Sequence, residues 1–141
     1  MTNTLSHIAP VARVLLALIF ILSGFQKLGD PAGTAAYIAS GGLPGWLVWP
    51  TILLEIGAGL ALAVGFQARV AALALAGFSL LSGVLYHLLP SFAAEGMAAQ
   101  MQMIMFMKNV SITGGLLLVT AIGAGAWALD NRATNGTLQT A

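Results

Sequence analysis

Four long apolar segments dominate this sequence and restrict its fold more than any other feature. They run from about residue 8 to 28, 46 to 64, 70 to 89 and 102 to 129. A helix of about 20 mostly apolar residues spans the roughly 30 Å hydrocarbon core of a bilayer. The sequence therefore predicts four transmembrane helices, followed by a polar tail at 130–141.

The composition is typical of a membrane protein. Hydrophobic residues make up 59% and charged residues 6% of the chain, against about 25% charged in an average soluble domain. A length of 141 residues leaves room for a single domain, 1–141. The net charge of +1 offers no basic surface for nucleic acid. Because cysteine is absent, disulfides, Cys-ligated metal sites and covalent haem are excluded.

The connections predict an antiparallel bundle with a short helix in its first outer loop. Asp30 and Pro31 are typical of a helix start, as N-cap and first helical residue. The turn at 65–69 is short enough to make the second and third spans antiparallel. The expected fold is therefore an all-α membrane protein, a bundle of four transmembrane helices.

The basic residues predict the orientation. Arg13, Arg69 and Arg132 lie at one set of span ends, while the lysines at the other ends are balanced by acids. The positive-inside rule then places both termini in the cytoplasm. The apolar run 14–25 has the length of a secretory signal, but it lacks a basic leader and a cleavage motif. We therefore expect an uncleaved first span.

Two charged residues lie deep within apolar spans. They are Glu55 in the second span and Lys108 in the fourth. A lysine there costs roughly 2.5–3.5 kcal/mol on insertion scales, so it normally faces the bundle interior and finds a partner. At 1.5 Å per residue, Glu55 lies about 14 Å and Lys108 about 9 Å below the outer ends of their spans. We therefore expect the two to pair and to form the floor of a buried polar site.

Further polar side chains are expected in the same outer half of the bundle. They are Gln26, Lys27, His87 and Asn109. With the expected ion pair, these are the candidate ligand-binding residues, and a plainer role competes for each. The ion pair could serve to fix the register of the helices without binding a ligand. The lysine could anchor to headgroups, and the histidine and asparagine could bond a neighbouring loop or helix.

The remaining polar features point away from catalysis. Arg13, near the inner face, is expected as an interfacial anchor. A methionine run, Met97 to Met107, contains thioethers that suit Cu(I). At helical spacing these side chains follow two faces and cannot all converge, and methionine is ordinary packing material, so we expect no metal site. No catalytic triad, carboxylate pair, HExxH motif or phosphate loop appears.

The polar residues stand in short motifs. These are Arg13, Gly24-Phe25-Gln26-Lys27-Leu28, Leu54-Glu55-Ile56-Gly57, His87, and Phe106 to Gly115. Their combination resembles the DoxX family of small bacterial membrane proteins. The resemblance implies a four-helix protein of the inner membrane. It also implies a link to quinone-coupled oxidation of thiosulfate, or to membrane oxidoreductase complexes that resist oxidative stress.

Three functions are compatible with these residues. The first is a quinone-reactive subunit of a redox complex, in which Glu55, Lys108 and His87 would hydrogen-bond the quinone, because the side chains themselves carry no electrons. The second is a module that binds or transports a lipid headgroup or small metabolite. The third is a non-catalytic anchor for a soluble enzyme. The expected partners are the lipid bilayer and a soluble redox enzyme, and a homo-oligomer stays open.

Overall fold

A computed structural model describes residues 7–131, which are helical almost throughout and contain no strand. Four helices are long and apolar enough to span a membrane. The helical elements are α2 (Ile8–Gly29), α3 (Pro31–Ser40), η1 (Gly45–Leu47), α4 (Val48–Val64), α5 (Ala68–Gly83), η2 (Val84–Leu88), α6 (Leu89–Ser91) and α7 (Gly96–Ile122). The expected all-α membrane fold is confirmed.

The short helix α3 forms where the sequence indicated. The Asp30 carboxylate accepts a hydrogen bond from the Gly33 N–H at 2.9 Å, and Pro31 occupies the first turn. Gly42 then turns the chain with a φ of 80°, which glycine adopts without a Cβ clash. The helix is thereby fixed at both ends in the connection between α2 and α4.

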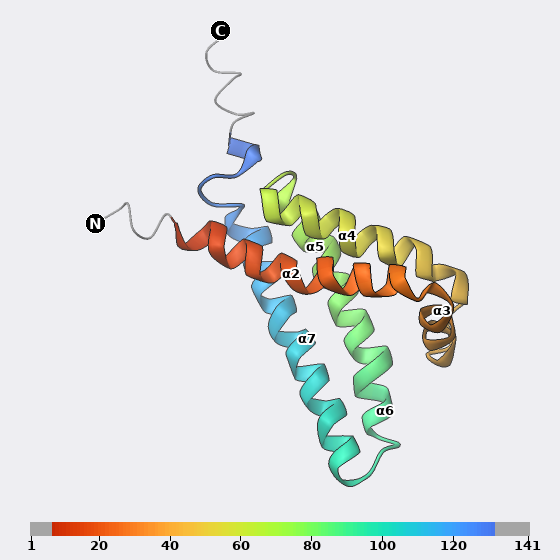
Figure 1. The fold of residues 1–141 in the computed structure, drawn as a ribbon. Helices are drawn as coiled ribbons and strands as arrows, with labels where there is room; N and C mark the ends of the chain where they lie inside the picture. Colours follow the sequence, from red (N-terminus) through yellow and green to blue (C-terminus); the bar gives the residue numbers. More distant parts are fainter. Residues whose placement is uncertain (1–6, 132–141) are drawn as a thin grey trace, which may run out of the picture.

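The spanning helices pack as two antiparallel pairs. α2 packs against α4, and α5 packs against α7. Figure 1 shows the pairs meeting near the 65–67 turn and the two ends of the described chain, and diverging away from them. We call the region where the pairs meet the terminal end. The opposite region, with α3 and the turn at 92–95, is the distal end.

The main apolar core lies toward the terminal end and joins the two pairs. Its buried members are Ala17, Phe20, Leu62, Ala71, Ala72, Leu75, Ala76 and Leu116. The many alanines let the helix backbones approach closely. At the distal end, the buried cluster of Ile38, Val48 and Ile52 joins only α3 to α4. Apolar packing therefore holds the pairs together at one end and leaves space between them at the other.

Two glycines bring α2 and α4 into close contact. A Cβ added at Gly24 would lie 2.5 Å from Ile56 Cγ1 and 3.2 Å from Glu55 Cβ. A Cβ added at Gly59 would lie 2.9 Å from Ile21 Cγ1. All three distances are shorter than an ordinary carbon contact. Gly24 therefore sets the spacing of α2 and α4 next to Glu55.

Gly24→Leu is expected to lower the free energy of unfolding by about 1–3 kcal/mol, because the new side chain overpacks the contact between α2 and α4. Gly57→Leu is the matched control, since no atom would lie within 4 Å of a Cβ there. That change should be neutral or stabilising, because leucine is the better helix former. Unfolding in mixed detergent micelles, followed by circular dichroism, measures both. Equal effects would contradict the close contact.

The first three spans agree with expectation within two residues, and the fourth does not. α7 starts at Gly96 and ends at Ile122, not 102 and 129. Gly123 and Gly125, with φ of 93° and 72°, break the helix although the sequence stays apolar. The following segment crosses the terminal end, where the Asp130 carboxylate accepts the Ala68 N–H at 3.0 Å. Residues 132–141 of the expected polar tail lie outside the described residues.

Candidate functional site

A cavity of about 400 Å³ lies between the diverging helix pairs. α2, α3, α4, α5 with η2, and α7 all contribute to its mostly apolar wall. The charged and polar side chains on the wall include Ser23, Lys27, Thr34, Tyr37, Thr51, Glu55, Ser79, Ser82, Tyr86, His87, Lys108 and Asn109. The cavity thus has a mostly apolar wall that also carries a group of charged and polar side chains.

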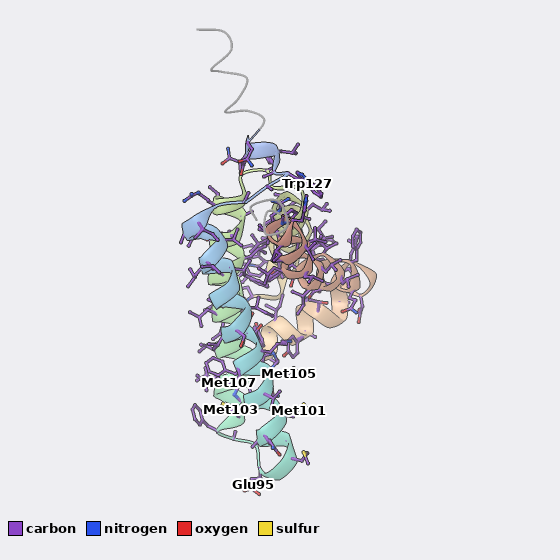
Figure 2. The ribbon with its side chains drawn as sticks, turned by 90° about the vertical axis from the view of Figure 1, so that its left-hand side faces the viewer. Glu95, Met101, Met103, Met105, Met107 and Trp127 are labelled. Carbon is purple, nitrogen blue, oxygen red and sulfur yellow. The ribbon has the colours of Figure 1, made fainter. Side chains whose placement is uncertain are left out.

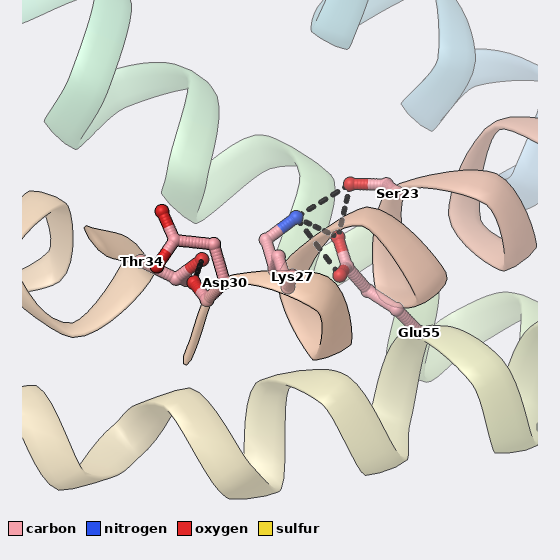
Figure 3. Close-up of polar contacts among 5 residues, drawn as sticks. All are labelled: Ser23, Lys27, Asp30, Thr34 and Glu55. Carbon is pink, nitrogen blue, oxygen red and sulfur yellow. Dashed lines mark hydrogen bonds and ion pairs between the residues drawn. The ribbon is translucent and has the colours of Figure 1, made fainter. Parts of the chain in front are cut away.

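The centre of that polar group is Glu55, whose side chain is buried. Lys27 Nζ lies 2.9 Å from Glu55 Oε2 and 3.0 Å from Oε1. Ser23 Oγ donates to Oε1 at 3.1 Å and accepts from Lys27 Nζ at 2.5 Å. Figure 3 shows the three side chains meeting between α2 and α4. The carboxylate is therefore compensated by a lysine from the neighbouring helix.

Local helix geometry assembles this cluster. Ser23 and Lys27 are four residues apart, so they lie one above the other on the same face of α2. Gly24, between them in sequence, lets that face approach Glu55 on α4. A lysine stem then reaches the carboxylate while its side chain stays 25% exposed. The apolar part of the stem can remain against the helices.

The prediction that Glu55 pairs with Lys108 was wrong. The partner of Glu55 is Lys27, which is therefore more than an interfacial anchor. The reason is that α4 packs on α2, whereas α7 packs on α5 across the cavity. Lys108 lines the same cavity from the opposite pair. Within residues 7–131, no carboxylate lies at ion-pair distance from Lys108.

The other candidate residues divide between the cavity wall and the surface. Asn109 lies on the wall, and its Oδ1 accepts a hydrogen bond from Ser79 Oγ at 3.2 Å. His87 also lies on the wall, with Nδ1 2.8 Å from Gln102 Oε1. Gln26 is exposed and absent from the wall. It points about 100° away from Lys27 around α2, so it cannot share that face.

Sequence reasoning missed several polar members of the wall. Ser23 carried a usable signal, because it precedes Lys27 by one helical turn. Tyr37 and Tyr86 carried none, since they meet only through the packing of α3 against η2. Partial burial raises the pKa of the Tyr37 phenol above its ordinary value, so this hydroxyl stays neutral near pH 7.

The carboxylate retains an unused hydrogen-bonding capacity. Glu55 Oε2 is buried and lies at ion-pair distance from Lys27, yet no donor approaches it with hydrogen-bond geometry. Buried polar atoms are normally hydrogen-bonded. The opposite wall offers the Lys108 ammonium and the Asn109 amide as donors. The arrangement suits a molecule with hydroxyl or carbonyl groups at one end and an apolar remainder.

Comparison with known proteins agrees with this architecture. The DoxX family model matches residues 8–88, more than half of the chain. The chain belongs to the DoxX family. It is 44% identical to inner membrane protein YqjF of Escherichia coli K12 over 120 residues, covering 85% of this chain and 87% of the relative. Inner membrane protein YphA of the same organism is 36% identical over 124 residues, 86% and 87% of the two chains. No solved structure matches significantly.

The methionine run of this DoxX-family protein lies apart from the polar cluster. Figure 2 shows Met101, Met103, Met105 and Met107 spread along the distal half of α7. Met101, Met103 and Met107 are exposed, as expected of apolar side chains on a lipid-facing helix surface. Within residues 7–131, no three His, Asp or Glu side chains are grouped to hold a metal ion.

Arg13, one of the residues that carry the family resemblance, lies at the terminal end and outside the cavity. It is 3% exposed. Its Nε donates to the Ala63 carbonyl at 3.2 Å, and Nη1 donates to the Ala124 carbonyl at 2.5 Å. The expectation of an interfacial anchor was therefore wrong. Arg13 joins α2 and α4 to the segment after α7.

Proposed function

We propose that this DoxX-family protein binds the polar head of a membrane-dissolved molecule in the distal cavity, and that the molecule is a quinone serving a redox complex. The observation that carries the proposal is the buried Glu55 carboxylate on a mostly apolar cavity wall. Ionisable groups inside membrane spans are rare and mark functional sites. A volume of about 400 Å³ lies within the usual range for small-molecule sites.

The side chains fit a quinone head. Its oxygens accept hydrogen bonds, which the Lys108 ammonium and the Asn109 amide can donate. In the reduced form its hydroxyls donate, which suits the Glu55 carboxylate on the cavity wall. The apolar wall suits the ring substituents and the start of a tail. Bound quinone would supply the electron transfer that these side chains cannot perform.

The proposed setting is a membrane complex. The protein carries four candidate membrane-spanning helices, and both relatives are named as inner membrane proteins, which supports the inner membrane for this chain. Arg13 and Arg69 at the terminal end favour a cytoplasmic location for that end. In this proposal a soluble enzyme delivers or accepts the electrons that the bound quinone carries. Further copies of the chain would be additional members of such a complex.

Quinone retention tests the proposal. Protein purified in mild detergent should carry quinone, measured by solvent extraction and chromatography per mole of chain. Glu55→Gln should reduce retention about tenfold, because it removes a charge-assisted hydrogen bond. Glu95→Gln is the matched control, since that exposed carboxylate lies in the distal turn, away from the cavity. Wild-type protein that neither retains quinone nor binds added short-chain ubiquinone would contradict the proposal.

A lipid headgroup or anionic metabolite is the second candidate. It is favoured by Lys108, which leaves the cavity with more cationic than anionic groups in the described chain. Native mass spectrometry separates the two, because a phospholipid and a quinone add different masses. A phospholipid adduct lost on Lys108→Met would select the headgroup. If complex function survives replacement of Lys27 and Glu55 together, only the anchor role remains.

A further inference from the structure

Tyr86 connects the two helix pairs at the distal end. Its hydroxyl donates to the Ile38 carbonyl of α3 at 3.0 Å. Its ring stacks on Tyr37, with 4.9 Å between ring centroids and 28° between ring planes. Both tyrosines line the cavity, and Tyr37 is 53% exposed. The contact therefore lies where the cavity wall reaches the surface.

Gly41 provides the space for this contact. A Cβ added there would lie 2.5 Å from Tyr86 Cε1 and 2.9 Å from its hydroxyl oxygen. The φ of Gly41 is −86°, which any residue can adopt. Space and not backbone conformation therefore requires glycine. Without a side chain at this position, the Tyr86 ring lies directly against the end of α3.

The other hydrogen bonds and ring contacts between the pairs lie at the terminal end. There Arg13 binds the Ala124 carbonyl, the Asp130 N–H donates to the Gly65 carbonyl, and His7 contacts Trp127. The apolar core that joins the pairs also lies toward that end. Across residues 7–131, the distal hydrogen bond and ring stack between the pairs both belong to Tyr86. Tyr86 thus connects the helix pairs at the distal end, whereas an apolar core connects them toward the terminal end.

Tyr86 also lies in an unusual stretch of helix. Residues Val84–Leu88 form η2, a π-helical segment within the third span. Such segments are rare in helices and are frequent at functional sites. The segment carries Leu85, Tyr86 and His87, and all three line the cavity. A local change in helical bonding would therefore move three cavity residues together.

We propose that the contact of Tyr86 with Tyr37 and α3 is a gate on the cavity. When the contact forms, α3 is held against η2 and the opening of the cavity at that end is narrowed. When it breaks, the pairs separate about the terminal end and the cavity exchanges its contents. The gate does not depend on which molecule the cavity binds, so its test uses no ligand.

Cysteine labelling measures the gate directly, because the chain contains no native cysteine. We place the reporter at Ser82, a half-buried residue of the cavity wall, as Ser82→Cys. Tyr86→Phe keeps the ring but removes the hydroxyl, and should raise the rate of maleimide labelling about fivefold, the effect of losing one hydrogen bond. Gly41→Leu displaces the ring and should raise the rate at least as much. Ser111→Cys on the exposed face of α7 is the control.

Spin-label distances separate opening from general loosening. The pair Ala39→Cys and Ala93→Cys spans the distal ends, and the pair Ala12→Cys and Ala121→Cys spans the terminal end, all at exposed positions. Tyr86→Phe should lengthen and broaden only the distal distance. Unchanged labelling and distances in both gate variants would overturn the gate, as would equal changes at both ends. If the gate variants open the cavity but the protein does not bind quinone, the gate is supported and the proposed function is contradicted.

Discussion

Lys27→Met is expected to lower the free energy of unfolding by about 3 kcal/mol, whereas Lys108→Met should change it by less than about 0.5 kcal/mol. Both changes remove a lysine from the wall of the same cavity. Only the first leaves the buried Glu55 carboxylate without its cation. The cost should fall at the low end of values for broken buried pairs, because Lys27 is partly exposed.

A double variant checks the cause. Lys27→Met combined with Glu55→Leu removes both charges, and buried pairs replaced by apolar residues are often neutral in stability. The combination should therefore recover most of the loss caused by Lys27→Met alone. Unfolding in mixed micelles, followed by far-ultraviolet circular dichroism, provides the measurement. A Lys108→Met variant as unstable as Lys27→Met would instead support the partner expected from sequence.

The partner of Glu55 shows what the depth of a residue in the membrane can and cannot predict. Depth along the spans correctly placed Glu55 and Lys108 in one region, since both line the same cavity. It could not tell which helices are neighbours, because depth contains no information about position around the bundle axis. The deciding signals were Gly24 and Ser23 on α2, which adapt that helix to Glu55. Such packing signals become readable only once the neighbour is known.

Other features divide in the same way between local and long-range causes. The four spans and the start of α3 follow from apolar runs and from Asp30 with Pro31, which act locally. The early end of α7 had a local signal in Gly123 and Gly125, hidden by the apolar residues around it. The Tyr86 contact joins residues 48 positions apart in the chain, so nothing in the local sequence predicts it.

The two-pair architecture links these observations to the cavity. Small side chains in the core toward the terminal end let all four spans approach closely. Toward the distal end, larger and polar side chains such as Leu85 and Lys108 line the cavity. Packing at one end therefore fixes the helix pairs firmly enough for a polar site to persist at the other.

Two arginines at the terminal end allow the contribution of buried hydrogen bonds there to be measured. Each donates two hydrogen bonds to carbonyl oxygens of other segments. Arg13 is buried and binds Ala63 and Ala124. Arg69 is exposed and binds Thr120 and Ala121 near the end of α7. The two arginines have the same side-chain chemistry and donate the same number of hydrogen bonds, but they differ in burial.

Arg13→Met is therefore expected to lower the free energy of unfolding by about 3 kcal/mol, and Arg69→Met by about 1 kcal/mol or less. Methionine keeps most of the arginine stem, so the difference reports the carbonyls left without donors. Buried carbonyls lose their partners outright, whereas exposed ones bind water instead. Hydrogen exchange at residues 123–131 should accelerate in Arg13→Met alone, because Arg13 holds the Ala124 carbonyl of that segment. Equal losses of stability, or unchanged exchange, would show that Arg13 does not join the helix pairs.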